Sequence, residues 1–145
     1  MLIRIIPNQI PQVWEQVKYA AVNTDRVENG NLQKYLNSLL QSLLNGKTQC
    51  FLRINDNREL LAVILTELRA SYLDGEKSLF IKNIFSFKSV DSIEWEENMS
   101  SIDKYAKAMG CKTILGCSSN NRIFELALSL GFKESHRYFV KDLEV

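Results

Sequence analysis

The spacing of apolar residues along this 145-residue chain switches several times between the alternation typical of strands and the three-to-four spacing typical of helices. Read in order, the pattern predicts the element order β-α-α-β-β-β-α-β-α-β. The predicted strands cover residues 2–6, 49–54, 60–72, 78–87, 113–117 and 133–143. The predicted helices begin at Pro11, Leu32, Ser92 or Ile93, and Asn121 or Arg122, and they end near residues 21, 44, 109 and 130.

Glycines mark several of these boundaries. Gly46, Gly110 and Gly131 each follow a helical run, where glycine readily adopts the positive φ that ends a helix. Asp74-Gly75 predicts a hairpin turn between two strands. Because hairpins come first and a β-α-β unit follows, we expect an α/β (α+β) fold with a mixed, mostly antiparallel six-stranded sheet. About four helices would cover both faces, in a single domain spanning residues 1–145.

Composition narrows the classes of partner. Apolar residues make up 46% of the chain, charged residues 24%, and the net charge is +1, which is ordinary for a soluble protein and argues against binding nucleic acid. No apolar run approaches the roughly 20 residues that cross a bilayer, and the start lacks the features of a signal peptide. We therefore expect a cytoplasmic protein that binds neither nucleic acid nor membrane.

The residues that commonly bind metals are sparse. Cys50, Cys111 and Cys117 show no C-x-x-C spacing, and His136 is the single histidine. No cysteine, carboxylate or serine motif accompanies that histidine. The pattern predicts free thiols and no metal site.

Two segments carry a resemblance to a known family. The segment from Asn120 to Phe132 resembles the part of the GNAT acetyltransferases in which an asparagine ends the fifth strand and a helix ends in Leu-Gly-Phe. The segment from Tyr105 to Ile114 is similar to the family's third helix entering that strand. Together with the element order, the resemblance covers nearly the whole chain. It implies the acetyltransferase fold and acetyl-coenzyme A as the usual acyl donor.

The family holds the pyrophosphate of this coenzyme with a loop of the form Gln/Arg-x-x-Gly-x-Gly/Ala at the start of the third helix. Counting back from Tyr105, the basic position falls at Val90 and the glycine positions fall at Ile93 and Trp95. No glycine occurs between Gly75 and Gly110. Four acidic residues lie in the same stretch: Asp91, Glu94, Glu96 and Glu97.

These residues suit a plain helix start better than a phosphate site. Acids favour the positive end of the helix dipole but repel a polyanion, and Ser92 is a suitable N-cap. We therefore expect no cofactor, with acetyl-coenzyme A bound only if the altered loop still holds it.

The catalytic groups that the resemblance implies are also missing. The tyrosine of the family's fourth helix corresponds to Ala127, and residues 78–88 contain no acid where many members have a glutamate base. Three residues are candidates to replace them: Glu67 as base, and Tyr138 or Cys117 as acid. Asn120 either contacts a coenzyme or caps the helix that follows it.

The resemblance with these losses implies a catalytically inactive protein that serves as a structural or protein-interaction module, with a protein partner or a second copy. An exposed Trp95 would be a partner-binding candidate. Small phage-encoded proteins include similar members, some of them virion components, so host cytoplasm or virion is the expected location. Two alternatives stay open. One is an active N-acyltransferase with an atypical loop, and the other is a small-molecule sensor that uses the same cleft.

Overall fold

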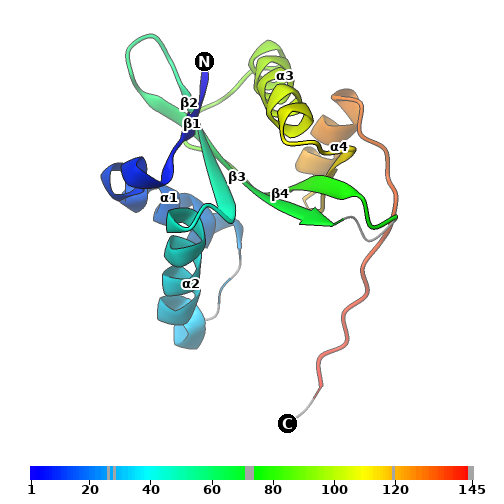
Figure 1. The fold of residues 1–145 in the computed structure, drawn as a ribbon, viewed down its shortest axis with the longest axis horizontal. Helices are drawn as coiled ribbons and strands as arrows, with labels where there is room; N and C mark the ends of the chain where they lie inside the picture. The colour runs from blue at the N-terminus through cyan, green and yellow to red at the C-terminus, as the bar shows by residue number, and fades with distance from the viewer. Residues whose placement is uncertain (26, 28, 71–73, 119, 144–145) are drawn as a thin grey trace.

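The computed structural model describes residues 1–25, 27, 29–70, 74–118 and 120–143. In this part of the chain, five strands form one sheet in the order β1-β2-β3-β4-β5 (Figure 1). The strands are β1 (Leu2–Ile5), β2 (Thr48–Ile54), β3 (Leu60–Ala70), β4 (Lys77–Ser86) and β5 (Thr113–Gly116). The helices are α1 (Ile10–Thr24), α2 (Leu32–Leu44), α3 (Ser92–Ala108) and α4 (Asn121–Ser129), and short 3-10 turns cover Pro7–Gln9 and Asn29–Asn31.

The sheet is mixed, as the element order predicts. β1 to β4 pair antiparallel with their neighbours, and β5 runs parallel to β4 after the crossover through α3. Gly46 and Gly131 have positive φ values of 81° and 94° after α2 and α4, which confirms that they end these helices.

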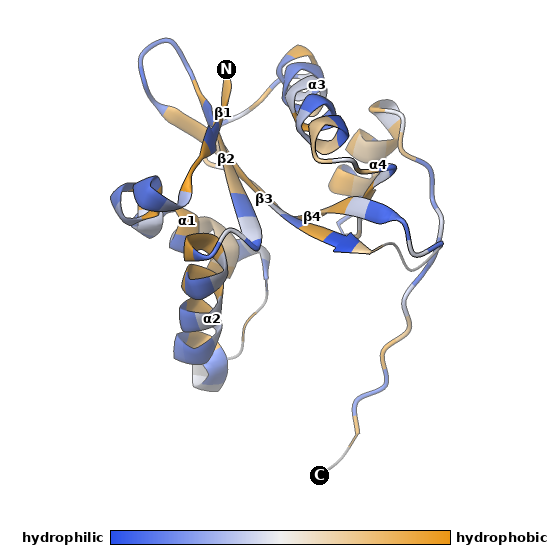
Figure 2. Ribbon diagram, viewed as in Figure 1, coloured by the Kyte–Doolittle hydropathy of each residue, from blue (hydrophilic) through white to orange (hydrophobic). Residues whose placement is uncertain are grey.

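Helices cover both faces of the sheet. On one face, α1 and α2 pack on β2 and β3 around buried residues that include Val17, Leu43 and Leu65. On the other, α3 packs on the central strands around Phe51, Leu79 and Ile102, and α4 adds partly buried side chains. Figure 2 shows the apolar residues gathered on the strands and on the helix sides that face them. The prediction of helices on both faces is confirmed.

The prediction of a sixth strand is wrong for the described residues. Residues 133–143 form no strand, although their apolar positions alternate. Alternation reports only which side chains share a face, whereas a strand also needs a neighbouring strand for its backbone. Two predicted ends differ by a few residues. The helix α1 extends to Thr24 and not to about residue 21, and β5 stops at Gly116 and not at residue 117. The part of the predicted strand 60–72 that follows Ala70 lies outside the described residues.

Candidate functional site

The fourth and fifth strands part within the sheet. Their parallel pairing ends where Ile81 lies opposite Gly116, but β4 continues to Ser86. The next residue of β4, Lys82, is the extra residue of a β-bulge against β3. A bulge leaves backbone groups without ladder partners, and bulges are common next to functional sites. Among the described residues, the second half of β4 therefore has an open edge on the β5 side.

The α3 start, which we define as residues 90–97, is closed by the chain's own groups. Its N-cap is Asp91, not the predicted Ser92, because the extended backbone of Asp91 aims its side chain at the helix end. Asp91 Oδ1 accepts a hydrogen bond from Glu94 N at 2.8 Å, and Asp91 O accepts one from Trp95 N at 3.0 Å. The Trp95 bond is the first regular bond of the helix. Of the N–H groups that a helix start leaves free, the one of Glu94 is therefore already bonded within the chain.

The two positions that correspond to glycines in the resemblance have opposite environments. Ile93 is 66% exposed, whereas Trp95 is 9% exposed and packs with Met99 and Ile102 in the core beneath α3. Residues two apart on a helix point in different directions, which separates the pair. Val90 is half-buried against the same cluster. Trp95 is therefore a core residue, and the condition for its role in binding a partner is not met.

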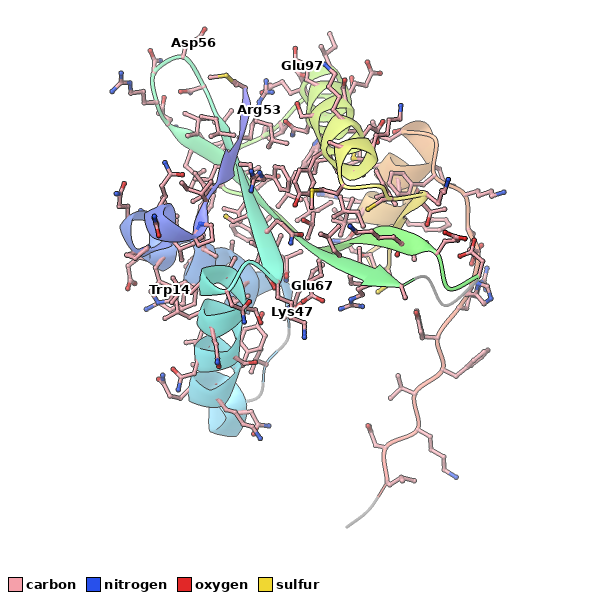
Figure 3. All side chains as sticks on the ribbon, viewed as in Figure 1. Trp14, Lys47, Arg53, Asp56, Glu67 and Glu97 are labelled. Atoms are coloured by element: carbon pink, nitrogen blue, oxygen red, sulfur yellow. The ribbon has the colours of Figure 1, made fainter. Side chains whose placement is uncertain are left out.

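An arginine from β2 holds the acidic side chains of the α3 start (Figure 3). Arg53 Nη2 lies 2.9 Å from Glu97 Oε2 and 3.4 Å from Glu94 Oε2, and Arg53 Nη1 donates to Asn98 Oδ1 at 3.3 Å. Arg53 is only 7% exposed and Asn98 is fully buried. The four acids are therefore not a bare negative patch, because two of them neutralise one buried cation.

The residues of the α3 start do not fit the pyrophosphate of coenzyme A. A phosphate cradle needs free N–H groups and backbone that can approach closely, which glycines allow. Here the Asp91 side chain occupies the N–H group of Glu94, and every position from 90 to 97 carries a side chain. The cation at this helix start, Arg53, is already engaged by Glu94 and Glu97. A pyrophosphate would have to displace these contacts and face the charge of Asp91.

Asn120 acts as the N-cap of α4. Its Oδ1 accepts a hydrogen bond from Arg122 N at 2.9 Å, and its own N–H donates to Ser118 Oγ at 3.0 Å. Of the two roles that the sequence left open for this residue, the structure provides the contacts of the cap.

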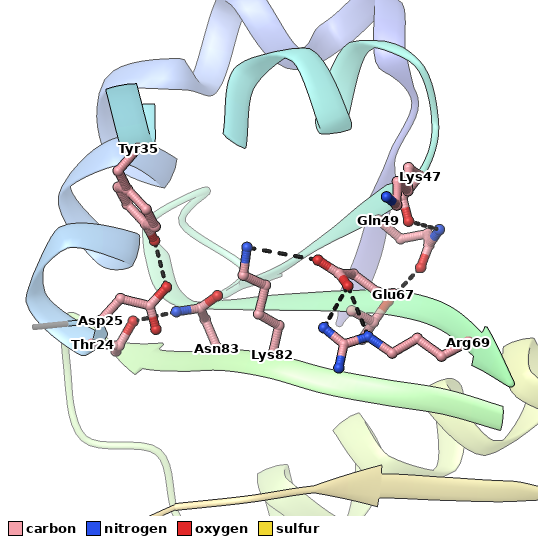
Figure 4. A network of polar contacts seen from close by, with 10 residues as sticks. Thr24, Asp25, Tyr35, Lys47, Gln49, Glu67, Arg69, Lys82 and Asn83 are labelled. Atoms are coloured by element: carbon pink, nitrogen blue, oxygen red, sulfur yellow. Dashed lines mark hydrogen bonds and ion pairs between the residues drawn. The ribbon is translucent and has the colours of Figure 1, made fainter. Parts of the chain in front are cut away.

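A polar cluster lies on the opposite face of the sheet from α3, between the end of α1, the first turn of α2 and the strands β3 and β4 (Figure 4). We call it the α1–β4 cluster; it consists of Thr24, Asp25, Tyr35, Glu67, Arg69, Lys82 and Asn83. Tyr35 donates its hydroxyl proton to Asp25 Oδ2 at 2.5 Å, which links the two helices. Asn83 Nδ2 donates to Thr24 Oγ1 at 2.6 Å and so ties β4 to α1.

Two groups of the α1–β4 cluster, the Asn83 side-chain oxygen and the Tyr35 hydroxyl, have defined hydrogen-bonding roles. Asn83 is 3% exposed, and its Oδ1 has no hydrogen-bond partner among the described residues. Leaving a buried acceptor unpaired costs about 1–3 kcal/mol, so this oxygen would gain from any donor that reaches it. Burial raises the pKa of Tyr35, and the hydrogen bond to Asp25 and the charge of Asp25 raise it further. The tyrosine therefore keeps its proton and remains a donor.

Glu67, the candidate base, is held by cations. Arg69 donates to Glu67 Oε2 from Nε at 2.9 Å and from Nη2 at 2.7 Å, and Lys82 Nζ lies 3.7 Å from Glu67 Oε1. Burial raises the pKa of this carboxyl, but the hydrogen bond and charge of Arg69, with the charges of Lys82 and Lys47, lower it below its ordinary value. A low pKa weakens a base. The catalytic role of Glu67 stays a prediction.

This ion pairing predicts a pH-dependent contribution to stability. The unfolded-state pKa of Glu67 is near 4.5 and its folded-state pKa is lower. The stabilisation is therefore present above pH 4.5 and is lost as the pH falls through the folded value. Glu67→Gln is expected to lower the melting temperature at pH 7 and to have a smaller effect at pH 3, as measured by circular dichroism. Glu15→Gln, which breaks an exposed helix pair with Lys18, is the control. Equal losses at both pH values for Glu67→Gln would contradict the assignment.

The two candidate acids lie in different places. Glu67 is opposite Phe80, which is opposite Leu115, so the three form one row across β3, β4 and β5. Cys117 follows this row by two residues and is exposed. Tyr138 lies in the segment that forms no strand, and it is largely exposed. Both assignments stay predictions.

The sequence contained a signal for only some of the residues that matter here. Lys82 and Asn83 are two adjacent polar residues that interrupt the apolar run from Leu79 to Phe85, and this interruption could have indicated the bulge. Arg53, a charge within an apolar strand, could have indicated a buried partner. No local pattern pointed to Asp25, because its contact with Tyr35 depends on how α1 and α2 meet.

Other site types find no support among the described ranges. In residues 1–25, 27, 29–70, 74–118 and 120–143, no group of three or more His, Cys, Asp or Glu residues could hold a metal ion. Within the same ranges, no helix has both the length and the apolar character to cross a membrane. Two surface hollows of ≈ 370 and ≈ 350 Å³ lie along α2 and between α1 and α2.

Comparisons with known proteins identify the fold. No family model matches the chain, and no curated protein matches it. Solved structures do match over the full length. A Pyrococcus furiosus protein that carries an acetyltransferase assignment is 18% identical with a TM-score of 0.75, and the match covers 99% of this chain and 100% of that one.

Two aminoglycoside acetyltransferases are similar to the chain in the same way. The 6'-N-acetyltransferase AAC(6')-Ih from Acinetobacter baumannii is 16% identical with a TM-score of 0.71, and the match covers 99% of both chains. The enzyme meta-AAC0020 from an uncultured soil sample is 11% identical with a TM-score of 0.70, covering 99% of this chain and 96% of that one. The chain therefore has the fold of the GNAT acetyltransferases. At these identities the likeness concerns the fold alone.

Proposed function

We propose that this protein uses the acetyltransferase fold as a protein-interaction module and does not bind coenzyme A. The observation that carries the proposal is the closed α3 start. The Asp91 side chain caps the Glu94 N–H, Trp95 packs in the core beneath the helix, and Arg53 is engaged by Glu94 and Glu97. These contacts stabilise the helix start without a ligand, which supports the proposal.

Exposed apolar side chains support the binding part of the proposal. Phe124 and Leu128 lie one helical turn apart on α4, and both are about half exposed. Among its described residues, α4 has none that is fully buried. Apolar side chains left exposed on one helix face are typical of surfaces that contact another protein. The phage and virion attribution stays a prediction.

Titration with acetyl-coenzyme A tests the proposal. We expect no change in melting temperature at 1 mM ligand. If the dissociation constant were about 10 μM, the ligand would stabilise the protein by about 2.7 kcal/mol, or roughly 8 °C for a domain of this size. An active acetyltransferase of the same fold, assayed in parallel, shows that the assay detects binding. A clear rise in melting temperature of this protein would overturn the proposal.

A second candidate function is an acyltransferase that accepts an amine at the α1–β4 cluster. The observation that favours it is the buried, unpaired Oδ1 of Asn83, which lies in a cluster with the carboxylates of Asp25 and Glu67. These acceptor oxygens suit an ammonium group. Release of free coenzyme A thiol from acetyl-coenzyme A, dependent on an added amine and lost in Asn83→Leu, would support this candidate over the first.

A further inference from the structure

The helix α2 carries two parallel rows of side chains beside the face that it buries. Residues four apart on a helix lie one above the other, so each row consists of every fourth residue. Leu39 and Leu43 are buried in the core beneath α2. Next to them lie a row of leucines and then a row of amides, which we call the leucine row (Leu36, Leu40 and Leu44) and the amide row (Gln33, Asn37, Gln41 and Asn45).

Both rows lie at the surface. Leu36 and Leu40 are half-buried, Leu44 is 47% exposed, and every member of the amide row is exposed. In Figure 1, α2 lies at the edge of the fold, away from α3 and α4. The hollow of ≈ 370 Å³ runs between the two rows, and its lining residues all belong to α2 and its C-cap. A groove between two such rows of one helix has the shape into which a row of another helix packs.

This part of the surface is uncharged. Residues 35–46 contain no Asp, Glu, Lys or Arg, although charged residues make up 24% of the chain. The outer face of a surface helix normally carries charged residues, as α1 does with Glu15 and Lys18. Charged residues are instead depleted at the centre of interfaces between proteins. The exposed side of α2 therefore has the composition of an interface.

We propose that α2 of one copy of this chain packs on α2 of a second copy, across a two-fold axis that passes near Leu40 and Gln41. These two residues are the centre of the uncharged stretch 35–46. The leucine row of each copy would enter the groove between the two rows of the other copy, with the helix axes crossing at about −50°. Because both copies present the same surface, one contact fills both grooves.

The amide row favours a second copy as the occupant of this surface. Near a two-fold axis each side chain meets its own copy, so a charged residue there would meet a like charge. A carboxamide has both a donor and an acceptor, so the Gln41 side chain can form hydrogen bonds with its own copy. A lipid surface would instead favour several Lys or Arg residues beside the leucines, and α2 has one, Lys34, in its first turn.

The inference goes beyond the proposed function and does not depend on it. It rests on α2, whereas the proposed function rests on the α3 start and on the exposed side chains of α4. Binding of acetyl-coenzyme A would leave the expected α2 contact unchanged, and a chain that does not associate through α2 would leave the coenzyme prediction unchanged.

Sedimentation velocity over a concentration series tests the contact. We expect association with a dissociation constant of roughly 10–100 μM, because one pair of helices buries less than the about 1,600 Å² of a standard interface. The acid pair Asn37→Asp, Gln41→Glu replaces two exposed amides by carboxylates of the same shape, and it should weaken the association by at least roughly tenfold. The matched control, Gln12→Glu with Gln16→Glu, makes the same change of charge at two exposed positions four apart on α1 and should leave the association unchanged.

Mixing variants of opposite charge tests whether the two copies meet through this surface. The basic pair Asn37→Lys, Gln41→Lys should also associate poorly with itself, but an equimolar mixture of the acid and basic pairs should associate at least as well as the wild type. Mixing would not repair a folding defect, so recovery reports the contact. The proposal would be overturned by a wild type that does not associate, an acid pair no weaker than the α1 control, or a mixture that fails to associate.

Cross-linking tests the position of the axis. Cys111 and Cys117 are replaced by serine, and Cys50, which is buried, is kept. Because residues near a two-fold axis meet their own copies, a short bis-maleimide is expected to link two chains that each carry Gln41→Cys. Chains that carry Gln16→Cys on α1 are the control and should remain unlinked. Absence of a linked pair for Gln41→Cys, or equal yields from the two variants, would sink the model.

Discussion

Replacing Trp95 by alanine is expected to lower the free energy of unfolding by about 4 kcal/mol, in the range usual for truncating a buried tryptophan. Trp95 is 9% exposed and lies in the cluster that joins α3 to the central strands, with Met99 and Ile102. The truncation removes a large apolar side chain and leaves a cavity beneath the first turns of α3. The melting temperature should fall by roughly 10 °C, measurable by calorimetry or by urea denaturation with an unchanged slope.

Ile93→Ala is the matched control, because Ile93 is the other position that corresponds to a loop glycine. Ile93 is mostly exposed, so its truncation should change stability by less than about 0.5 kcal/mol. The contrast between the two variants tests whether only the Trp95 side of the α3 start is packed in the core. If Trp95→Ala cost no more than Ile93→Ala, residues 90–97 would not be the packed unit that excludes a phosphate, and the proposed function would lose its main support.

Arg53→Met is expected to cost about 3 kcal/mol, because removing one partner of a buried polar network leaves the others unsatisfied. Methionine keeps most of the buried volume, so the loss reports the polar contacts. Asn98 Oδ1 would lose its donor inside the core, where Asn98 Nδ2 already has no partner among the described residues. Glu94 and Glu97 would lose the cation that they share.

The same substitution at Arg69 separates burial from ion pairing. Arg69 also contacts a carboxylate, Glu67, but its side chain is nearly half exposed. Exposed ion pairs contribute about 0–1 kcal/mol, so Arg69→Met should be mild. Chemical denaturation of both variants gives the comparison. Equal costs would show that Arg53 acts only as a surface ion pair, which its burial argues against.

Most helices and strands could be predicted from the spacing of apolar residues. The predicted range 32–44 coincides with α2, and the predicted strand 49–54 differs from β2 by one residue. Such patterns work because a side chain's direction depends on backbone geometry within a few residues. The lack of glycine in the stretch that becomes the α3 start is likewise visible in the chain alone, and the structure gives it physical meaning through the contacts of Asp91 and Trp95.

Contacts between distant segments could not be read from the same patterns. The sequence did not show that Arg53, more than forty residues earlier, lies against Glu97 and Asn98, because that contact depends on α3 packing across β2. Nor could it show that residues 133–143 lack a neighbouring strand, since an alternating segment forms a strand only where another backbone offers hydrogen bonds. Local geometry therefore specified the elements and the altered loop. The tertiary arrangement, in which side chains and backbones find partners far away in the chain, decided how the α3 start is closed and left Phe139 and Val140 exposed.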